Sequence, residues 1–186
     1  MLMRVITGIA RGRKLLTVEG TDLVRPTAEK VKEAIFSAIQ FDIEGRRVLD
    51  LFAGSGQLGI EALSRGAQSA VFVDSSKTSL AAVAKNLEAT GLSENAEVVY
   101  SDYSAYLTRS NKTFDIVFLD PPYKAGILTD AVIKVSNHLS DYGIVFCEHP
   151  TGNSMPDEIV GLKINRTYKF GSVSVTMYKK DEANNG

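Results

Sequence analysis

Apolar and polar residues follow two different periods along the chain, and these periods predict strands that alternate with helices. Short apolar runs predict strands at Val48–Leu51, Ala70–Val73, Glu97–Tyr100, Phe114–Leu119 and Gly143–Cys147. Apolar residues that recur every three or four positions predict helices at Ala28–Gln40, Leu58–Ser64, Lys77–Thr90 and Ala125–Leu139. A short helix is also expected around Tyr106 and Leu107, and Thr27 is the expected N-cap of the first helix.

This alternation predicts the fold class. Short strands joined by helices form right-handed crossovers, so we expect a doubly wound α/β sheet that is mostly parallel and covered on both faces. Two later segments, Lys163–Phe170 and Ser172–Tyr178, alternate on either side of Gly171 and predict an antiparallel hairpin at the sheet edge. Near the start, Met3–Thr7 and Lys14–Val18 predict a small N-terminal β-hairpin extension.

The composition indicates one soluble domain of 186 residues, 44% of them hydrophobic, with a net charge of −1. We expect a basic hairpin arm over residues 1–24, a main domain over 25–180 and a frayed tail over 181–186. No apolar run approaches the length of a membrane span, and no signal peptide is evident, so we expect a cytoplasmic protein. The single cysteine, Cys147, excludes an internal disulfide and a multi-cysteine metal site, and we expect no metal.

The four residues Asp120-Pro121-Pro122-Tyr123 directly follow the predicted strand Phe114–Leu119. Two consecutive prolines fix φ at both positions and remove two backbone donors, so the strand ends in a stiff corner. Asp120 and the Pro121 carbonyl can accept hydrogen bonds from an exocyclic amine, and Tyr123 can stack on a flat ring. The corner therefore predicts a site for an amine-bearing planar ring. A loop that uses two prolines only to end a strand is the alternative.

A glycine-rich turn follows the strand Val48–Leu51, where Gly54, Gly56 and Gly59 spell G-x-G-x-x-G before a helix. Asp74 ends the next strand, where an acid can bind a ribose hydroxyl. Taken literally, this is a dinucleotide site, but Asp50 would place a carboxylate beside the pyrophosphate. S-adenosylmethionine has no phosphate and carries two positive groups, an ammonium and a sulfonium, which suit Asp50. The pattern therefore favours S-adenosylmethionine.

A third acid, Asp102, follows the third strand and can accept the adenine amino group. The predicted cofactor-binding residues are Asp50, Phe52, Ala53, Gly54, Ser55, Gly56, Gly59, Asp74, Ser75, Asp102 and Tyr103. In doubly wound sheets the ligand lies beyond the carboxyl ends of the strands where strand order reverses, so Asp50 and Asp120 should face one crevice. This arrangement points to methyl transfer to a ring amine. Acids that only cap the following helices are the alternative.

With these motifs in place, the sequence resembles the S-adenosylmethionine-dependent methyltransferases. It is most similar to the bacterial small-subunit (16S) ribosomal RNA guanine-N2 methyltransferases of the RsmD type. The resemblance covers nearly the whole chain and rests on Arg4–Gly8, Gly12–Leu15, Arg25-Pro26-Thr27, Leu49–Gly56, Gly59–Ala67 and Asp120–Tyr123. It implies a seven-stranded Rossmann-like sheet, S-adenosyl-L-methionine as cofactor, and a guanine in ribosomal RNA or the small ribosomal subunit as substrate. Gln57 and Glu148-His149-Pro150 have no clear place in it.

Basic residues gather in the first 18 residues, which contain no acid. A local basic arm on a near-neutral body is compatible with contact to RNA phosphates. The predicted RNA-binding residues are Arg4, Arg11, Arg13 and Lys14, joined on the resemblance by Arg25 and Thr27. The predicted catalytic residues are Asp120, Pro121, Pro122 and Tyr123, and we expect a monomer.

Three other functions remain open at this point. The proline corner alone also suits an adenine-N6 DNA methyltransferase, although such enzymes usually need a separate target-reading region for which the chain has no spare length. The literal glycine fingerprint suits an NAD-linked oxidoreductase, but no second domain or hydride-transfer acid or base is evident. The third is a non-catalytic RNA-binding module with a vestigial cofactor pocket.

Overall fold

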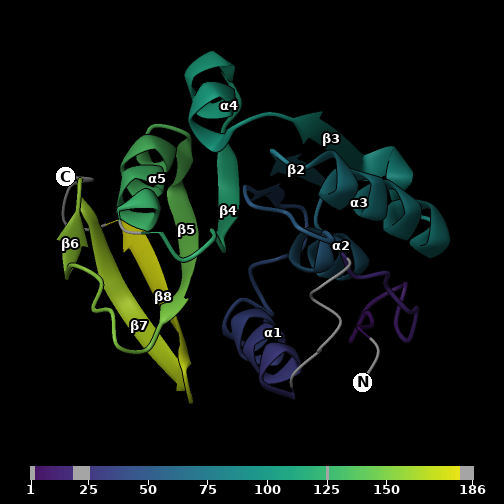
Figure 1. Ribbon diagram of the computed structural model, residues 1–186, viewed down its shortest axis with the longest axis horizontal. Helices are drawn as coiled ribbons and strands as arrows, with labels where there is room; N and C mark the ends of the chain where they lie inside the picture. The colour runs from purple at the N-terminus through teal and green to yellow at the C-terminus, as the bar shows by residue number, and fades with distance from the viewer. Residues whose placement is uncertain (1–2, 19–25, 125, 181–186) are drawn as a thin grey trace.

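The computed structural model of the chain describes residues 3–18, 26–124 and 126–180. Its centre is one eight-stranded sheet with the order β3-β2-β1-β4-β5-β8-β7-β6 (Figure 1). The strands are β1 Arg47–Asp50, β2 Ser69–Asp74, β3 Ala96–Tyr100, β4 Phe114–Leu119, β5 Leu139–Pro150, β6 Glu158–Ile159, β7 Leu162–Phe170 and β8 Val173–Lys180. Strands β1 to β5 pair in parallel, which confirms the predicted doubly wound fold.

The edge of the sheet is antiparallel, as the sequence predicts. β8 pairs antiparallel with both β5 and β7, and β7 turns into β8 at Gly171. The short strand β6 pairs with the start of β7 and adds an eighth strand to the expected seven. β5 is longer than predicted, because its antiparallel pairing with β8 continues through Glu148, His149 and Pro150.

One helix precedes the parallel strands, and the others connect them. They are α1 Pro26–Ala38, α2 Gln57–Ser64, α3 Lys77–Thr90, α4 Tyr103–Arg109 and α5 Ile127–Ser136, with a short 3₁₀ helix η1 at Ser93–Asn95. No helix in the described ranges is both long enough and apolar enough to cross a membrane.

Several helix boundaries differ from the sequence prediction by one to three residues, and two of the differences have a clear cause. α1 begins at Pro26, so Thr27 lies in its first turn and is not the N-cap. Proline is favoured at this position because the first turn does not use its missing N–H. The last predicted helix ends at Ser136, because Leu139 already opens β5 and pairs with Phe114 of β4.

The two faces of the sheet carry separate apolar cores. Val48 and Phe72 belong to one core, which α1, α2 and α3 cover. Leu49 and Val71 belong to the other, which α4 and α5 cover. Successive side chains of a strand point to opposite faces, so these continuous apolar strands supply both cores. The predicted burial on both faces is confirmed.

Residues 3–18 form an arm that lies against the body. Its two predicted segments pair antiparallel at one bridge, between Arg4 and Lys14. The backbone N–H groups of Ile6 and Thr7 donate to the carboxylate of Glu61 in α2, at 2.8 and 2.9 Å. The predicted boundary of the arm at residue 24 and the tail 181–186 lie outside the described residues, so the division of the chain stays a prediction.

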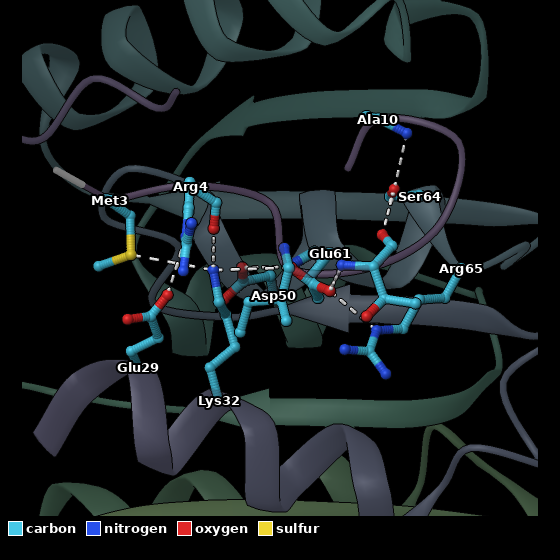
Figure 2. A network of polar contacts seen from close by, with 12 residues as sticks. Met3, Arg4, Ala10, Glu29, Lys32, Asp50, Glu61, Ser64 and Arg65 are labelled. Atoms are coloured by element: carbon cyan, nitrogen blue, oxygen red, sulfur yellow. Dashed lines mark hydrogen bonds and ion pairs between the residues drawn. The ribbon is translucent and has the colours of Figure 1, made fainter. Parts of the chain in front are cut away.

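A buried ion pair completes this attachment (Figure 2). Nζ of Lys32 in α1 donates to the carbonyl of Arg4 at 2.6 Å and lies 3.6 Å from Oε2 of Glu61. Arg65 donates to the other oxygen of Glu61 at 2.8 Å. Burial lowers the pKa of Lys32, against the opposing effect of Glu61. Removing one partner of such a buried pair typically costs about 3–5 kcal/mol, so the pair fixes the arm to both helices.

Asn86 of α3 attaches the arm at a second point. Its Oδ1 accepts from the N–H of Leu16 at 2.7 Å, and its Nδ2 donates to the carbonyls of Leu16 and Ser55, both at 2.9 Å. Ser55 belongs to the glycine-rich turn. One buried amide therefore joins the arm, α3 and that turn.

Candidate active site

Strand order reverses between β1 and β4, and two acids leave the sheet at this point. β2 and β3 lie on one side of β1, whereas β4 and β5 lie on the other. β1 and β4 are parallel, with Asp50 opposite Phe118, so Asp50 and Asp120 emerge at the same edge. The charge of Asp120 contributes to raising the pKa of Asp50, so the two carboxyl groups lie within electrostatic reach of each other.

The turn between β1 and α2 depends on its glycines. Gly54 and Gly56 have φ values of 55° and 78°, in the left-handed region that other residues rarely adopt. A Cβ on Gly59 would lie only 2.3 Å from Cε1 of Phe72, so this glycine lets α2 approach β2 closely. The N–H of Gly54 donates to Asp74 at 2.9 Å, which ties the turn to the end of β2.

A cavity of about 490 Å³ opens beside this turn. Its lining includes the predicted site residues Phe52, Gly54, Asp74, Ser75, Asp102, Tyr103, Asp120, Pro121 and Pro122. Pockets for small molecules typically measure about 300–1,000 Å³. The predicted residues Ala53, Ser55, Gly56 and Gly59 do not line the cavity, and instead shape the turn and the start of α2.

Two acids in the cavity also organise the backbone. Asp74 accepts hydrogen bonds from the N–H groups of Gly54 and Ser76. Asp102 caps α4, because its Oδ1 accepts from the N–H groups of Ser104 and Ala105. A carboxylate has about four lone-pair sites, so each acid keeps acceptor capacity for a ligand. Helix capping and ligand binding are therefore compatible at these positions.

An aromatic pair forms one wall of the cavity. The rings of Phe52 and Tyr103 are 5.3 Å apart at 43°, and the hydroxyl of Tyr103 donates to Asp130 at 2.6 Å. This hydrogen bond fixes the ring and raises the pKa of Tyr103 to about 12. Of the neighbouring tyrosines, Tyr100 is exposed and Tyr106 is buried in the core.

Asp50 lies beneath the turn and does not line the cavity. It is 3% exposed and accepts a hydrogen bond from the N–H of Gly59 at 3.0 Å. Burial raises the pKa of Asp50 to about 8, and the charges of Asp120 and Asp74 act in the same direction. Asp50 thus holds α2 against β1, and its direct contact with a cofactor stays a prediction.

The proline corner separates this cavity from a second one. Pro121 and Pro122 line both, and the second cavity, of about 250 Å³, is also lined by Tyr123 and Glu148. Asp120 lines the first cavity and Tyr123 the second, where Tyr123 is 62% exposed. The corner is therefore a thin wall with an acid on one side and an aromatic ring on the other.

Glu148 is the residue of this region that sequence reasoning missed. β5 lies parallel to β4 with Cys147 opposite Leu119, so Glu148 comes beside Asp120. Burial and the charge of Asp120 raise the pKa of Glu148 to about 8, and burial raises that of Asp120 to about 6. The available signal was its position: Glu148 follows an apolar strand, as Asp120 does.

The four predicted RNA-binding residues that the structure describes in full line neither of these two cavities. Arg11, Arg13 and Lys14 are exposed on the arm, and Arg4 donates to Glu29 of α1 at 3.0 Å. Arg25 and the side chain of Thr27 lie outside the described part of the chain. Within the described ranges, no group of three or more His, Cys, Asp or Glu side chains is arranged to hold a metal ion.

Two other cavities, of about 200 and 660 Å³, lie at the amino ends of the parallel strands. Asp115 and Ile116 line the first, and Arg47 and Ser69 line the second. Ligands of doubly wound sheets bind at the opposite, carboxyl ends, where the perturbed acids gather here. The two cavities that share the proline corner are therefore the candidate active site.

Comparison with known proteins places the chain in a family. The family model described as Conserved hypothetical protein 95 matches residues 3–179. The chain belongs to this family. YlbH of Bacillus subtilis is 40% identical over 183 residues, which are 96% of this chain and 99% of YlbH.

A curated sequence and a solved structure from Escherichia coli extend the comparison with the Conserved hypothetical protein 95 family. Ribosomal RNA small subunit methyltransferase D of strain K12 is 33% identical over 181 residues, which are 96% of this chain and 90% of that protein. The solved structure of yhhF superposes with a TM-score of 0.86 at 32% identity, over 97% of this chain and 99% of yhhF. The resemblance to the RsmD type is confirmed.

Proposed function

We propose that this chain transfers a methyl group from S-adenosyl-L-methionine to the exocyclic N2 amine of a guanine in small-subunit (16S) ribosomal RNA. The observation that carries the proposal is the shared wall, because Pro121 and Pro122 line both cavities. A methyl donor in one cavity and a planar ring in the other would meet at this corner. Membership of the Conserved hypothetical protein 95 family supports the proposal, since a relative is named ribosomal RNA small subunit methyltransferase D.

The residues of the larger cavity suit the cofactor. Asp74 ends β2, where doubly wound sheets hold a ribose diol. Phe52 and Tyr103 offer a wall for the adenine ring, and Asp102 offers an acceptor for its amino group. The acids gathered at this edge disfavour the diphosphate of NAD. When bound, S-adenosylmethionine supplies a methyl group on a positively charged sulfur.

The corner orients the acceptor amine. The lone pair of a guanine amine is delocalised into the ring, so the amine is a poor nucleophile. Hydrogen bonds from its N–H groups to Asp120 and the Pro121 carbonyl would turn that lone pair toward the methyl group, and most of the acceleration would come from positioning. Tyr123 would stack on a base that is unpaired or swung out of a helix. Asp120 or water would take the proton released after transfer.

The arm supplies the contact with RNA in this proposal. Arg11, Arg13 and Lys14 are exposed and would bind the phosphate backbone, with Arg25 and Thr27 nearby in sequence. Arg4 would share its charge between RNA and Glu29. We also propose that the protein acts as a monomer in the cytoplasm and uses no metal.

Methyl transfer to purified substrates tests the proposal. The protein is incubated with S-adenosylmethionine carrying a labelled methyl group and with small subunits or naked 16S ribosomal RNA from cells that lack this protein. We expect one guanine to gain a methyl group, located by mass mapping. Asp120→Ala should lower kcat/KM by about 100-fold or more, because it removes an acceptor that positions the amine.

A control variant and two contradicting outcomes complete the methyl-transfer test. The control is Asp42→Ala, which changes an exposed acid away from the corner and should leave kcat/KM unchanged. Near-normal turnover by Asp120→Ala would remove Asp120 from its role. Methylation of duplex DNA rather than ribosomal RNA, or calorimetric binding of NAD but not S-adenosylmethionine, would refute the proposal itself.

A further inference from the structure

The second cavity contains an acid that the proposed chemistry does not use. Glu148 lines this cavity together with Tyr123, Lys124 and His149. His149 is committed to the sheet, because its Nε2 lies 2.9 Å from Oγ1 of Thr176 and its Nδ1 lies 3.0 Å from the carbonyl of Pro150. Lys124 belongs to the loop after the corner. Among the described residues that line this cavity, Glu148 is therefore the one with a carboxyl side chain.

Glu148 and Asp120 form a pair of acids with unused acceptor capacity. Their positions follow from the parallel register of β4 and β5, which sets Glu148 beside Asp120. Within the described part of the chain, neither carboxyl group accepts a hydrogen bond from the protein. Two partly buried carboxylates without donors are unfavourable, since each is desolvated and each repels the other. The arrangement is suited to a ligand that brings several N–H donors.

The donor edge of guanine has this property. Guanine presents N1–H and the two N–H groups of its N2 amine side by side, whereas adenine presents an unprotonated N1 beside its amine. Hydrogen bonds to a carboxylate are roughly twice as strong as those between neutral groups. A carboxylate next to the amine-binding corner would thus attract the N1–H of guanine and repel the N1 lone pair of adenine.

We propose that Glu148 is the residue that selects guanine, by accepting the N1–H of the target base while Asp120 and the Pro121 carbonyl accept its N2 amine. The inference rests on the proposed function and deepens it. Burial raises the pKa values of both acids in the free protein, and N–H donors supplied by guanine would lower them again by stabilising the ionised forms. Positive charge on a cofactor beside Asp120 would also lower the pKa of that carboxyl group. Asp50 is another buried acid at this edge of the sheet.

Replacing the target guanine by 2-aminopurine tests the inference. 2-Aminopurine keeps the amine at C2 but has no N1–H, so its N1 lone pair would face Glu148. Ribosomal RNA is assembled by ligation around a synthetic segment that carries guanine or 2-aminopurine at the mapped site. We expect the protein to prefer guanine by about 100-fold or more in kcat/KM, since a site built to accept a hydrogen bond rejects the analogue that lacks it.

Glu148→Gln separates recognition from a structural role. The glutamine amide can accept from N1–H through its oxygen or donate to an unprotonated N1 through its nitrogen, so the guanine preference should narrow at least 10-fold. A role confined to stability would lower activity on both substrates equally and leave the ratio unchanged. The control is Glu88→Gln, which makes the same change at an exposed position of α3 and should keep the preference.

The results distinguish a failure of the proposed function from a failure of the proposed role of Glu148. If the unmodified protein methylates no ribosomal guanine, the proposed function fails. If it methylates guanine but treats 2-aminopurine equally well, or if Glu148→Gln keeps the full preference, the inference about Glu148 is overturned. Should Glu148→Gln be inactive on both RNAs, the ratio of their dissociation constants, measured by fluorescence anisotropy, decides in the same way.

Discussion

Asp120 shows how a single residue can be tuned by its place in the fold. It follows a strand that is buried along its whole length, and burial raises its pKa to about 6. The ionised carboxylate is the better acceptor for an amine, so kcat/KM should rise with pH through about 6 and, because Glu148 must also be ionised to accept N1–H, again through about 8. Asparagine keeps an acceptor oxygen but cannot titrate. We expect Asp120→Asn to be slower by about 10-fold and to lack the step near pH 6.

The measurement is kcat/KM for ribosomal RNA between pH 5 and pH 9, because this ratio reports the pKa values of the free enzyme. Asp42→Asn is the matched control at an exposed position and should keep the step. If the step near pH 6 persisted in Asp120→Asn, the group that titrates there would have to be another one, and Asp120 would lose this assignment.

At the scale of elements, the approach of α2 to β2 determines the shape of the turn beside the larger cavity. A Cβ at position 59 would lie 2.3 Å from the ring of Phe72, which is fully buried. We expect Gly59→Ala to lower the free energy of unfolding by about 1–3 kcal/mol through overpacking. Urea denaturation measures this loss. Gly152→Ala, where an added Cβ meets open space, should change it by less than about 0.5 kcal/mol.

The elements also show what the sequence could and could not predict. Periodicity placed the parallel strands, and the chemistry of Asp120–Tyr123 placed the corner at a strand end, because both are local properties. Glu148 was missed because its meaning depends on β5 lying in register beside β4, which is a property of the sheet. Asp50 is a second example. The sequence predicts its place at the end of a strand, but its burial and its hydrogen bond from Gly59 arise only when α2 packs against the sheet.

At the scale of the whole molecule, charge is distributed unevenly, with exposed cations on an arm that is fixed to a near-neutral body. If Arg11 and Arg13 each neutralise one RNA phosphate, the slope of log Kobs against log salt concentration should become less steep by about 1.4–1.8 in the double variant Arg11→Ala/Arg13→Ala. The slope is measured by fluorescence anisotropy with labelled 16S ribosomal RNA over a series of KCl concentrations.

A second double variant controls for net charge. Lys85→Ala/Lys169→Ala removes the same two charges from exposed positions of α3 and β7, and should leave the slope nearly unchanged. Equal losses in the two double variants would mean that RNA responds to the overall charge of the protein and that the arm has no special part.

The side-chain amide of Asn86 links the arm to the glycine-rich turn. It forms hydrogen bonds both to Leu16, two positions after Lys14, and to Ser55 in the glycine-rich turn. A nucleic acid that displaces the arm would therefore also strain or relax the turn that borders the cofactor cavity. Thermodynamic linkage makes such an effect mutual. If bound RNA changes the affinity for the methyl donor by some factor, the bound donor changes the affinity for RNA by the same factor. The order in which the two ligands load would then follow from their concentrations in the cell.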